Sequence, residues 1–212
     1  MTMRIFGICG QKQSGKDTFA DFALQALPAK RGTKRALATP LKRFCVDYLG
    51  LADQSVFGND TDKNAPVGVW NEIFTYKIAN RYDKKGKVIS GREVLQVVGT
   101  DIFRENFRPT FWLDLMLKKT IPTCAAQGVE IMFVTDVRFR NEVEGLQAAG
   151  AKIIRLYRDI PRDHQIQHAS ETEMASIPDN LFNYVVTPDQ NTSMGMLRNS
   201  VHRILQKEGL LE

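Results

Sequence analysis

The chain has 212 residues, of which 43% are hydrophobic and 25% charged, and its formal net charge is +5 at pH 7. This composition is ordinary for a globular protein with one sizeable core, and it excludes a disordered or fibrous chain. No apolar run approaches membrane-spanning length and no basic-then-apolar segment opens the sequence, so we expect a cytoplasmic protein that crosses no membrane. Nothing looks like a long linker, so a single domain over residues 1–212 is predicted.

The positive charge is modest and has two interpretations. It suits a nucleic-acid-binding protein, but it equally suits an enzyme whose ligands are anionic nucleotides. The one compact basic run, residues 84–87, is more typical of a solvated turn, so we expect no nucleic-acid partner. Cys9, Cys45 and Cys124 lack metal-ligand spacing and lie in apolar contexts, which predicts reduced core residues.

Residues 10–18, with the sequence GQKQSGKDT, carry the strongest signal. They follow an apolar run typical of a buried strand and precede helical apolar spacing. Such a glycine loop turns backbone N–H groups and the positive end of a helix dipole toward one point, which suits a polyphosphate. Lys16 would reach the β- and γ-phosphates and Thr18 would hold Mg²⁺, whereas the alternative is an ordinary turn with a surface lysine. The residues predicted to bind ATP here are Gly10, Lys12, Ser14, Gly15, Lys16, Asp17 and Thr18.

The residue after Lys16 is Asp17, so the hydroxyl is displaced by one place to Thr18. This ending resembles that of nucleoside monophosphate kinases and favours a small-molecule kinase over a switch GTPase. An acid in the first turn of a helix is also favoured by the dipole, and beside phosphates it repels them unless it meets a metal or an arginine. A catalytic and a structural Asp17 therefore both stay open.

One positively charged residue, Lys42, is predicted near a helix start. Residues 28–33 indicate a basic turn, 35–38 a short strand, and Thr39 with Pro40 a helix start that places Lys42 in the first turn. A cation gains nothing from the dipole there, which hints at a bound phosphate, although an exposed lysine has the same pattern. Residues 50–66 are polar and turn-rich, and they predict a loop that either folds over a ligand or is a surface excursion.

Ser90 and Glu93 have capping-box spacing before the apolar run 94–98. Arg92 then lies in the first turn, where it suits phosphate binding better than helix stability. Residues 99–101 are expected to end this helix, and 111–118 to form another. Trp112 in the latter is either a core residue or a platform on which a nucleobase stacks.

The apolar run 130–136 predicts a strand covered on both faces and ending in Asp136. Because ligands gather at the carboxyl ends of strands in open α/β sheets, Asp136 should lie beside the phosphate loop and orient Mg²⁺, unless it caps the next helix. Arg138 follows at once, and the strand 152–157 delivers Arg158. Residues 161–176 look like a lid, 184–187 form the last strand, and 193–205 the final helix. This alternation predicts an α/β fold with a parallel, doubly wound sheet.

Together these segments resemble the deoxynucleoside monophosphate kinases of T-even and related bacteriophages. The likeness covers most of the chain. It is carried by the order and spacing of residues 10–22, 95–96, 99–101, Phe107, Trp112, 134–138, 148–151, Arg158, His168 and Glu171. The resemblance implies a P-loop NTPase fold of the nucleoside monophosphate kinase type, in which helices flank a parallel sheet. It also implies a monophosphate-binding insertion at about 45–110 and a lid at about 158–178.

The activity that the resemblance implies is Mg²⁺-dependent transfer from ATP to deoxynucleoside 5′-monophosphates, serving phage DNA precursor synthesis. We predict catalytic roles for Lys16, Asp17, Arg138 and Arg158, a further ATP contact from Arg162, and metal binding by Thr18 and Asp136. Which arginine contacts the transferring phosphoryl is left open. The residues predicted to bind the acceptor nucleotide are Lys42, Arg92, Gln96, Thr100, Asp101, Trp112, Asp136 and Arg138.

Two departures from the family pattern concern specificity. The chain is shorter around residues 50–90, which bears on the choice of base, and Pro188-Asp189-Gln190 stands where Asn-Asp-Gly is expected, which bears on the adenine contacts. The alternatives are a kinase for another phosphorylated small molecule such as phosphomevalonate, and a non-catalytic nucleotide-binding module or switch. The number of subunits is also open, with a homodimer among the options.

Overall fold

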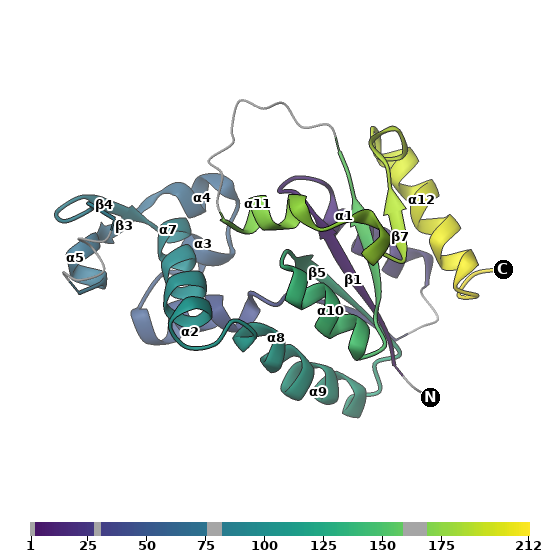
Figure 1. Cartoon of the computed structure of the whole chain (residues 1–212), viewed down its shortest axis with the longest axis horizontal. Coiled ribbons are helices and arrows are strands. Elements are labelled where there is room, and N and C mark those ends of the chain that lie inside the picture. The colour runs from purple at the N-terminus through teal and green to yellow at the C-terminus, as the bar shows by residue number, and fades with distance from the viewer. Residues whose placement is uncertain (1–2, 28–30, 76–81, 159–168) are drawn as a thin grey trace. The chain divides into compact units, whose positions relative to one another are not determined.

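A computed structural model describes residues 3–27, 31–75, 82–158 and 169–212, with the backbone alone for 169–172 (Figure 1). The chain divides into two compact units. The first comprises Met1–Leu37 together with Leu113–Glu212, and the second is Ala38–Trp112. Each is described by itself.

The first unit is built on a five-stranded sheet whose strand pairs are all parallel, in the order β2-β5-β1-β6-β7. Its central strand pairs with a neighbour on either side, as in Ile5 with Met132 and Ile8 with Ile154. This confirms the predicted α/β fold with a parallel sheet. The strands are β1 (Arg4–Gly10), β2 (Gly32–Arg35), β5 (Ile131–Val137), β6 (Lys152–Leu156) and β7 (Tyr184–Val186).

Alternate side chains of a strand point to opposite faces of a sheet, and helices cover both faces of this one. Phe6 and Ile8 of β1 belong to a core with α1 (Lys16–Ala26) and α12 (Met194–Lys207). Ile5 and Cys9 belong to a second core on the opposite face. That face is covered by the helical stretch α8 (Phe111–Leu115), η2 (Met116–Thr120) and α9 (Ile121–Ala126), by α10 (Arg140–Ala148) and by α11 (Ala169–Ser176).

The second unit is mainly helical and contains one antiparallel strand pair, β3 with β4. Phe103 lies at the centre of an aromatic cluster, with its ring centroid 4.6 Å from that of Phe111, 5.0 Å from Trp112 and 5.5 Å from Phe44. The elements are α2 (Thr39–Leu49), α3 (Asp53–Phe57), α4 (Asp60–Asn64), β3 (Pro66–Val69), α5 (Trp70–Ile73), β4 (Val88–Ser90), α7 (Gly91–Gln96) and the π-helical η1 (Val97–Glu105).

Three local predictions were wrong. The strand expected at 35–38 is β2 (Gly32–Arg35), an edge strand that pairs only with β5 and so needs no apolar run. Residues 50–66 were expected to form a loop, but they include α3 and α4. At the start of α4, the N–H of Asn59 donates to Asp62 Oδ2 at 2.9 Å and the N–H of Asp62 donates to Asn59 Oδ1 at 3.0 Å. Residues 99–101 do not end the helix, because burial of Val97 and Val98 outweighs the roughly 1 kcal/mol that a helical glycine costs.

The three cysteines are buried and free, as predicted for core residues. Among the described residues, no helix combines the length and apolarity needed to cross a membrane.

Candidate functional site

The predicted strand, glycine loop and helix are present as β1, residues 11–15 and α1. Gly15 precedes α1 with φ = 91°, a left-handed conformation that strongly favours glycine. Gly10 ends β1 where a Cβ atom would lie 2.5 Å from Ser14 Oγ and 2.7 Å from the carbonyl oxygen of Leu156. Both glycines are therefore required by the backbone, one for its dihedral angle and the other for close approach.

Lys16 is the first residue of α1, and its side chain closes the loop from within. The residue is only 8% exposed. Its Nζ donates hydrogen bonds to the carbonyl oxygens of Gly10 at 2.7 Å and Gln11 at 2.5 Å, and lies 3.5 Å from Ser14 Oγ. An ordinary surface lysine would extend into solvent, whereas this side chain is buried against its own loop. That Lys16 binds phosphates stays a prediction.

A pocket of about 270 Å³ opens on this loop. It combines the positive end of the α1 dipole with an ammonium and a guanidinium group, which is an arrangement that favours an anion. It brings together predicted residues from the loop and from the end of β6. The residues that line it are Gln13, Gly15, Lys16, Asp17, Thr18 and Arg158.

Asp17 lies at the exposed edge of this pocket, with its side chain 73% exposed. Lys34 Nζ is 3.7 Å from Asp17 Oδ1 and 2.8 Å from Asp21 Oδ1. The lysine therefore lies nearer to Asp21 than to Asp17, and it offsets only part of the Asp17 charge. Its catalytic and structural roles both stay predictions.

At the end of β5, two acids hold the backbone. Asp136 Oδ1 accepts a hydrogen bond from the backbone N–H of Leu37 at 2.6 Å. Glu142, only 4% exposed, accepts hydrogen bonds from the N–H groups of Arg138 at 2.9 Å and Phe139 at 3.1 Å. Glu142 thus fixes the turn that enters α10 and carries Arg138, a role that the sequence analysis did not find.

Cys9 reports on the electrostatics beneath the loop. Burial raises the pKa of its thiol to about 11, although the nearby positive charges of Arg155, Lys16 and Arg138 lower it in part. The thiol therefore stays neutral at physiological pH.

The sequence analysis also missed two buried polar residues near this site. Asn191 is 2% exposed, and its Nδ2 donates to the carbonyl oxygens of Ser14 and Tyr157, both at 2.8 Å. Arg155 is 3% exposed and donates to the carbonyl oxygen of Ile177 at 2.6 Å. A charged residue inside an apolar strand was the available signal for Arg155, whereas no local pattern marked Asn191.

The second unit contains Arg92, the predicted ligand of the acceptor phosphate, in the first turn of α7. Its Nε donates to Asn64 Oδ1 at 2.7 Å and its Nη2 to Asp60 Oδ1 at 2.6 Å. The guanidinium group is thus held in place by α4.

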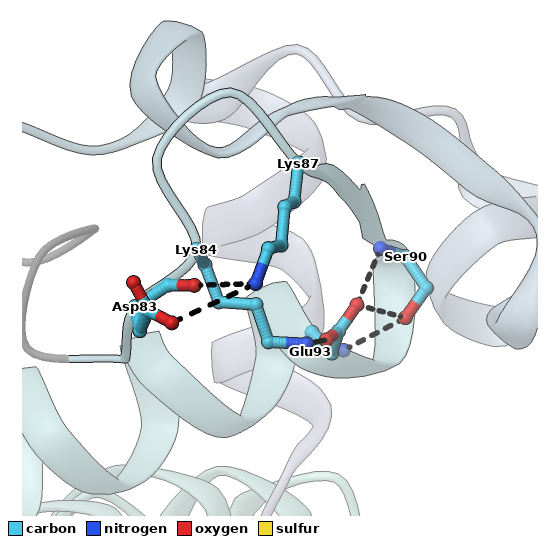
Figure 2. Close-up of polar contacts among 5 residues, drawn as sticks. All are labelled: Asp83, Lys84, Lys87, Ser90 and Glu93. Atoms are coloured by element: carbon cyan, nitrogen blue, oxygen red, sulfur yellow. Dashed lines mark hydrogen bonds and ion pairs between the residues drawn. The ribbon is translucent and has the colours of Figure 1, made fainter.

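The start of α7 is capped as predicted (Figure 2). Ser90 N donates to Glu93 Oε2 at 2.9 Å, and Glu93 N donates to Ser90 Oγ at 3.3 Å. Lys84 Nζ lies 3.4 Å from Glu93 Oε1, and Lys87 Nζ donates to the carbonyl oxygen of Asp83 at 2.8 Å. These lysines of the basic run thus have partners within the chain.

The other acceptor candidates have the following places in the second unit. Lys42 Nζ lies 5.2 Å from the centroid of the Phe57 ring, and Asp101 accepts a hydrogen bond from the Tyr82 hydroxyl. Trp112 is 6% exposed and its Nε1 donates to the carbonyl oxygen of Gly99 at 2.9 Å, which favours a core role over a stacking platform.

Five further residues were named in the sequence analysis. Gln96 and Thr100 are partly buried in α7 and η1. Arg162, His168 and the Glu171 side chain lie outside the described residues.

Comparisons with known proteins agree on a family. The sequence profile described as "Deoxynucleotide monophosphate kinase" matches residues 51–192. A protein of Acanthamoeba polyphaga mimivirus, provisionally named as a deoxynucleotide monophosphate kinase, is 28% identical over 191 residues, covering 82% of this chain and 84% of the relative. The deoxynucleotide monophosphate kinase of Enterobacteria phage T4 is 25% identical over 201 residues, covering 74% and 82%.

Two solved structures show weaker similarity. An unliganded sugar kinase from Janibacter sp. HTCC2649 gives a TM-score of 0.44 at 14% identity, covering 96% of this chain and 93% of the other. Shikimate kinase from Bacteroides thetaiotaomicron gives 0.42 at 14% identity, covering 98% and 99%. Neither score carries the assignment, which depends on the family profile and on its match to more than half of the sequence. The chain belongs to the deoxynucleotide monophosphate kinase family and is a nucleotide kinase.

Proposed function

We propose that the enzyme transfers the γ-phosphoryl group of ATP to the 5′-phosphate of a deoxynucleoside monophosphate and releases ADP and the diphosphate. The observation that carries this proposal is the pocket in which Lys16, the start of α1 and Arg158 meet, in a chain whose named relatives are deoxynucleotide monophosphate kinases. Such a reaction would serve the synthesis of DNA precursors, in phage-infected host cytoplasm if the gene is viral.

The protein has little covalent chemistry to perform, because the acceptor phosphate is already an anionic nucleophile. Its tasks are to position the two nucleotides and to neutralise the transferring group. Lys16 Nζ would exchange the carbonyl oxygens of Gly10 and Gln11 for oxygens of the ATP phosphates. Arg158, and Arg138 after β5, would stabilise the charge that develops on the phosphoryl group.

The predicted metal donors fit Mg²⁺. Thr18 and Asp136 supply a hydroxyl and a carboxylate, and Mg²⁺ prefers oxygen ligands, often one or two carboxylates together with substrate phosphates. When bound, the ion would offset phosphate charge. Thr18 lines the pocket, while Asp136 lies in β5 beside the central strand that leads into the loop.

On the acceptor side, we assign the 5′-phosphate to Arg92. A planar guanidinium group binds a phosphate through two parallel hydrogen bonds. In the structure the Arg92 guanidinium donates one hydrogen bond to Asp60 and one to Asn64. The phosphate would take the place of the Asp60 carboxylate. Recognition of the base is assigned to the polar residues Gln96, Thr100 and Asp101. Lys42 is a further candidate for the acceptor phosphate, and Trp112 would form part of the pocket wall from its place in the core. Closure is assigned to a lid at about 158–178 that includes Arg162.

The direct test is turnover with ATP and each of the four deoxynucleoside monophosphates, with Lys16→Ala as the decisive variant. We expect at least one monophosphate to be phosphorylated, and kcat/KM to fall by about 10³-fold or more in Lys16→Ala, because the main charge contact to the donor phosphates is lost. The fold should be retained, since the hydrogen bonds that Lys16 Nζ makes to Gly10, Gln11 and Ser14 stay within one loop.

The matched control is Lys34→Ala, which removes an ammonium close to Asp17 but not from the pocket lining. It should change kcat/KM by less than about threefold, as befits a partly exposed ion pair. Full turnover in Lys16→Ala would contradict the phosphate-loop assignment. Phosphorylation of phosphomevalonate, without phosphorylation of any of the four deoxynucleoside monophosphates, would contradict the proposed acceptor.

A further inference from the structure

We propose that Asn191 is a positioning residue of the phosphate pocket, one that orients the peptide groups at Ser14–Gly15 and Tyr157–Arg158. It touches no substrate itself and acts through these two segments. The inference rests on the proposed binding of ATP by the loop, and it deepens that function by naming what holds the loop in shape.

The contacts converge on one side-chain nitrogen. Nδ2 of Asn191 has two hydrogens and donates to two carbonyl oxygens, of Ser14 and Tyr157, at 2.8 Å each. These carbonyls belong to the phosphate loop and to the segment that leaves β6.

The consequence for the pocket follows from the geometry of the peptide bond. The described chain has no cis peptide bonds, and in a trans peptide the C=O and N–H groups point in opposite directions. When the Ser14 carbonyl points at Asn191, the N–H of Gly15 must point away from it. Gly15 and Arg158 both line the pocket, so the amide sets the direction of two N–H groups at its wall.

Burial makes this arrangement costly to lose. Asn191 is 2% exposed and Ser14 is fully buried, so removal of the amide would leave carbonyl oxygens without the donor they share. The backbone around Asn191 is itself held, since its N–H donates to the carbonyl oxygen of Pro188 at 2.9 Å and Ser200 Oγ donates to that of Gln190 at 3.2 Å. The amide is thus anchored to α12 and the turn before it.

The chain offers a matched control in Asn183. Its Oδ1 accepts a hydrogen bond from the backbone N–H of Ile153 at 2.7 Å, so it too is an amide that holds the backbone of β6. Ile153 lies near the amino end of that strand, whereas the pocket lies beyond its carboxyl end. Loss of Asn183 should therefore affect stability without affecting phosphate binding.

The experiment compares Asn191→Ala, Asn191→Asp and Asn183→Ala with the unmodified full chain. Binding of ATP and of inorganic tripolyphosphate is measured by calorimetry, alongside the thermal unfolding midpoint and the KM of each substrate. We expect Asn191→Ala to weaken binding of both ligands about tenfold, and Asn191→Asp to weaken it further because a carboxylate would face two carbonyl oxygens and the phosphates. The KM for the monophosphate should stay within about twofold, and Asn183→Ala should bind both ligands normally.

A purely structural role predicts something different. If Asn191→Ala and Asn183→Ala lower the unfolding midpoint alike and neither changes ligand affinity, the inference is wrong. If ATP binding weakens but tripolyphosphate binding does not, the amide acts on the nucleoside and the inference is again wrong. A chain that binds both ligands but phosphorylates no deoxynucleotide refutes the proposed acceptor, while Asn191→Ala still decides the present inference.

Discussion

Arg92 is the residue to which we assign the acceptor 5′-phosphate. Its two contacts, to Asp60 and Asn64, keep the guanidinium group extended from the first turn of α7. In the structure its charge is paired with Asp60. If Arg92 binds the 5′-phosphate as proposed, that phosphate would replace the Asp60 carboxylate, and the exchange would favour the more highly charged and better-fitting ligand.

We therefore expect Arg92→Ala to raise the KM for the monophosphate by about 10- to 100-fold, the range for losing charge-assisted hydrogen bonds. The KM for ATP should change by less than about threefold. Steady-state kinetics with each substrate varied in turn provides the measurement. Arg43→Ala is the control, because Arg43 belongs to the same unit, pairs with Asp53 at 3.0 Å and is not predicted to contact a substrate. A selective loss of ATP affinity in Arg92→Ala would show that the acceptor side is misplaced.

At this scale, sequence reasoning could place residues that lie close together in one motif. Lys16 and Thr18 line one pocket, as a strand, a loop and a helix in succession indicate, and their roles stay predictions. Asn191 was missed because its partners, Ser14 and Tyr157, are backbone groups far away in the sequence that only the fold brings near. Glu142 was missed for a different reason: its partners are three and four residues away, but Phe139 stands at the N-cap, where the usual capping signature has a serine or threonine. Asparagines after turns occur in many similar sequence contexts, so the sequence alone did not single out Asn191.

Among the elements, α7 depends most clearly on a local signal. We expect Ser90→Ala to lower the free energy of unfolding by about 1 kcal/mol, because the N–H of Glu93 loses its side-chain acceptor. Glu93→Gln keeps an oxygen for the N–H of Ser90 and loses only the partly exposed contact with Lys84, so its cost should be a few tenths of a kcal/mol. Urea denaturation of both variants checks this, and equal losses would show that the Lys84 contact, not the cap, holds the helix start.

Elements without such a signal were placed less well. Strand β2 is defined by backbone pairing with β5, which leaves no apolar pattern in residues 32–35. The continuation of α7 into η1 depends on burial of Val97 and Val98, and a glycine at 99 argues locally for the opposite. In each case a contact between distant segments outweighed the local preference of the residues.

The whole molecule joins a sheet unit that carries the phosphate loop to a helical unit, Ala38–Trp112, that contains the predicted acceptor region at 45–110. The fold class could be predicted because regular alternation of strands and helices permits few topologies. The binding role of the second unit stays a prediction, since no contact inside that unit distinguishes a nucleotide site from ordinary packing.

Hydrogen exchange tests this division of labour. ATP alone should slow exchange at residues 10–18, and a deoxynucleoside monophosphate alone should slow it at residues 90–106. At about 100 times its Kd, a ligand adds roughly 2.7 kcal/mol to the free energy of openings that abolish its site. Lys16→Ala should lose the first effect and keep the second. Protection of the loop by the monophosphate alone would reverse the assignment of the two units.

The hydrogen bonds from Lys16 to its own loop have a consequence for selection of ligands. The residue is only 8% exposed, and its ammonium group donates hydrogen bonds to two neutral carbonyl oxygens of the loop. If the loop binds phosphates as proposed, a ligand that brings only dipoles would gain little over these carbonyls, whereas a polyanion would gain more. Under that proposal the loop would select ligands by charge before any base is read.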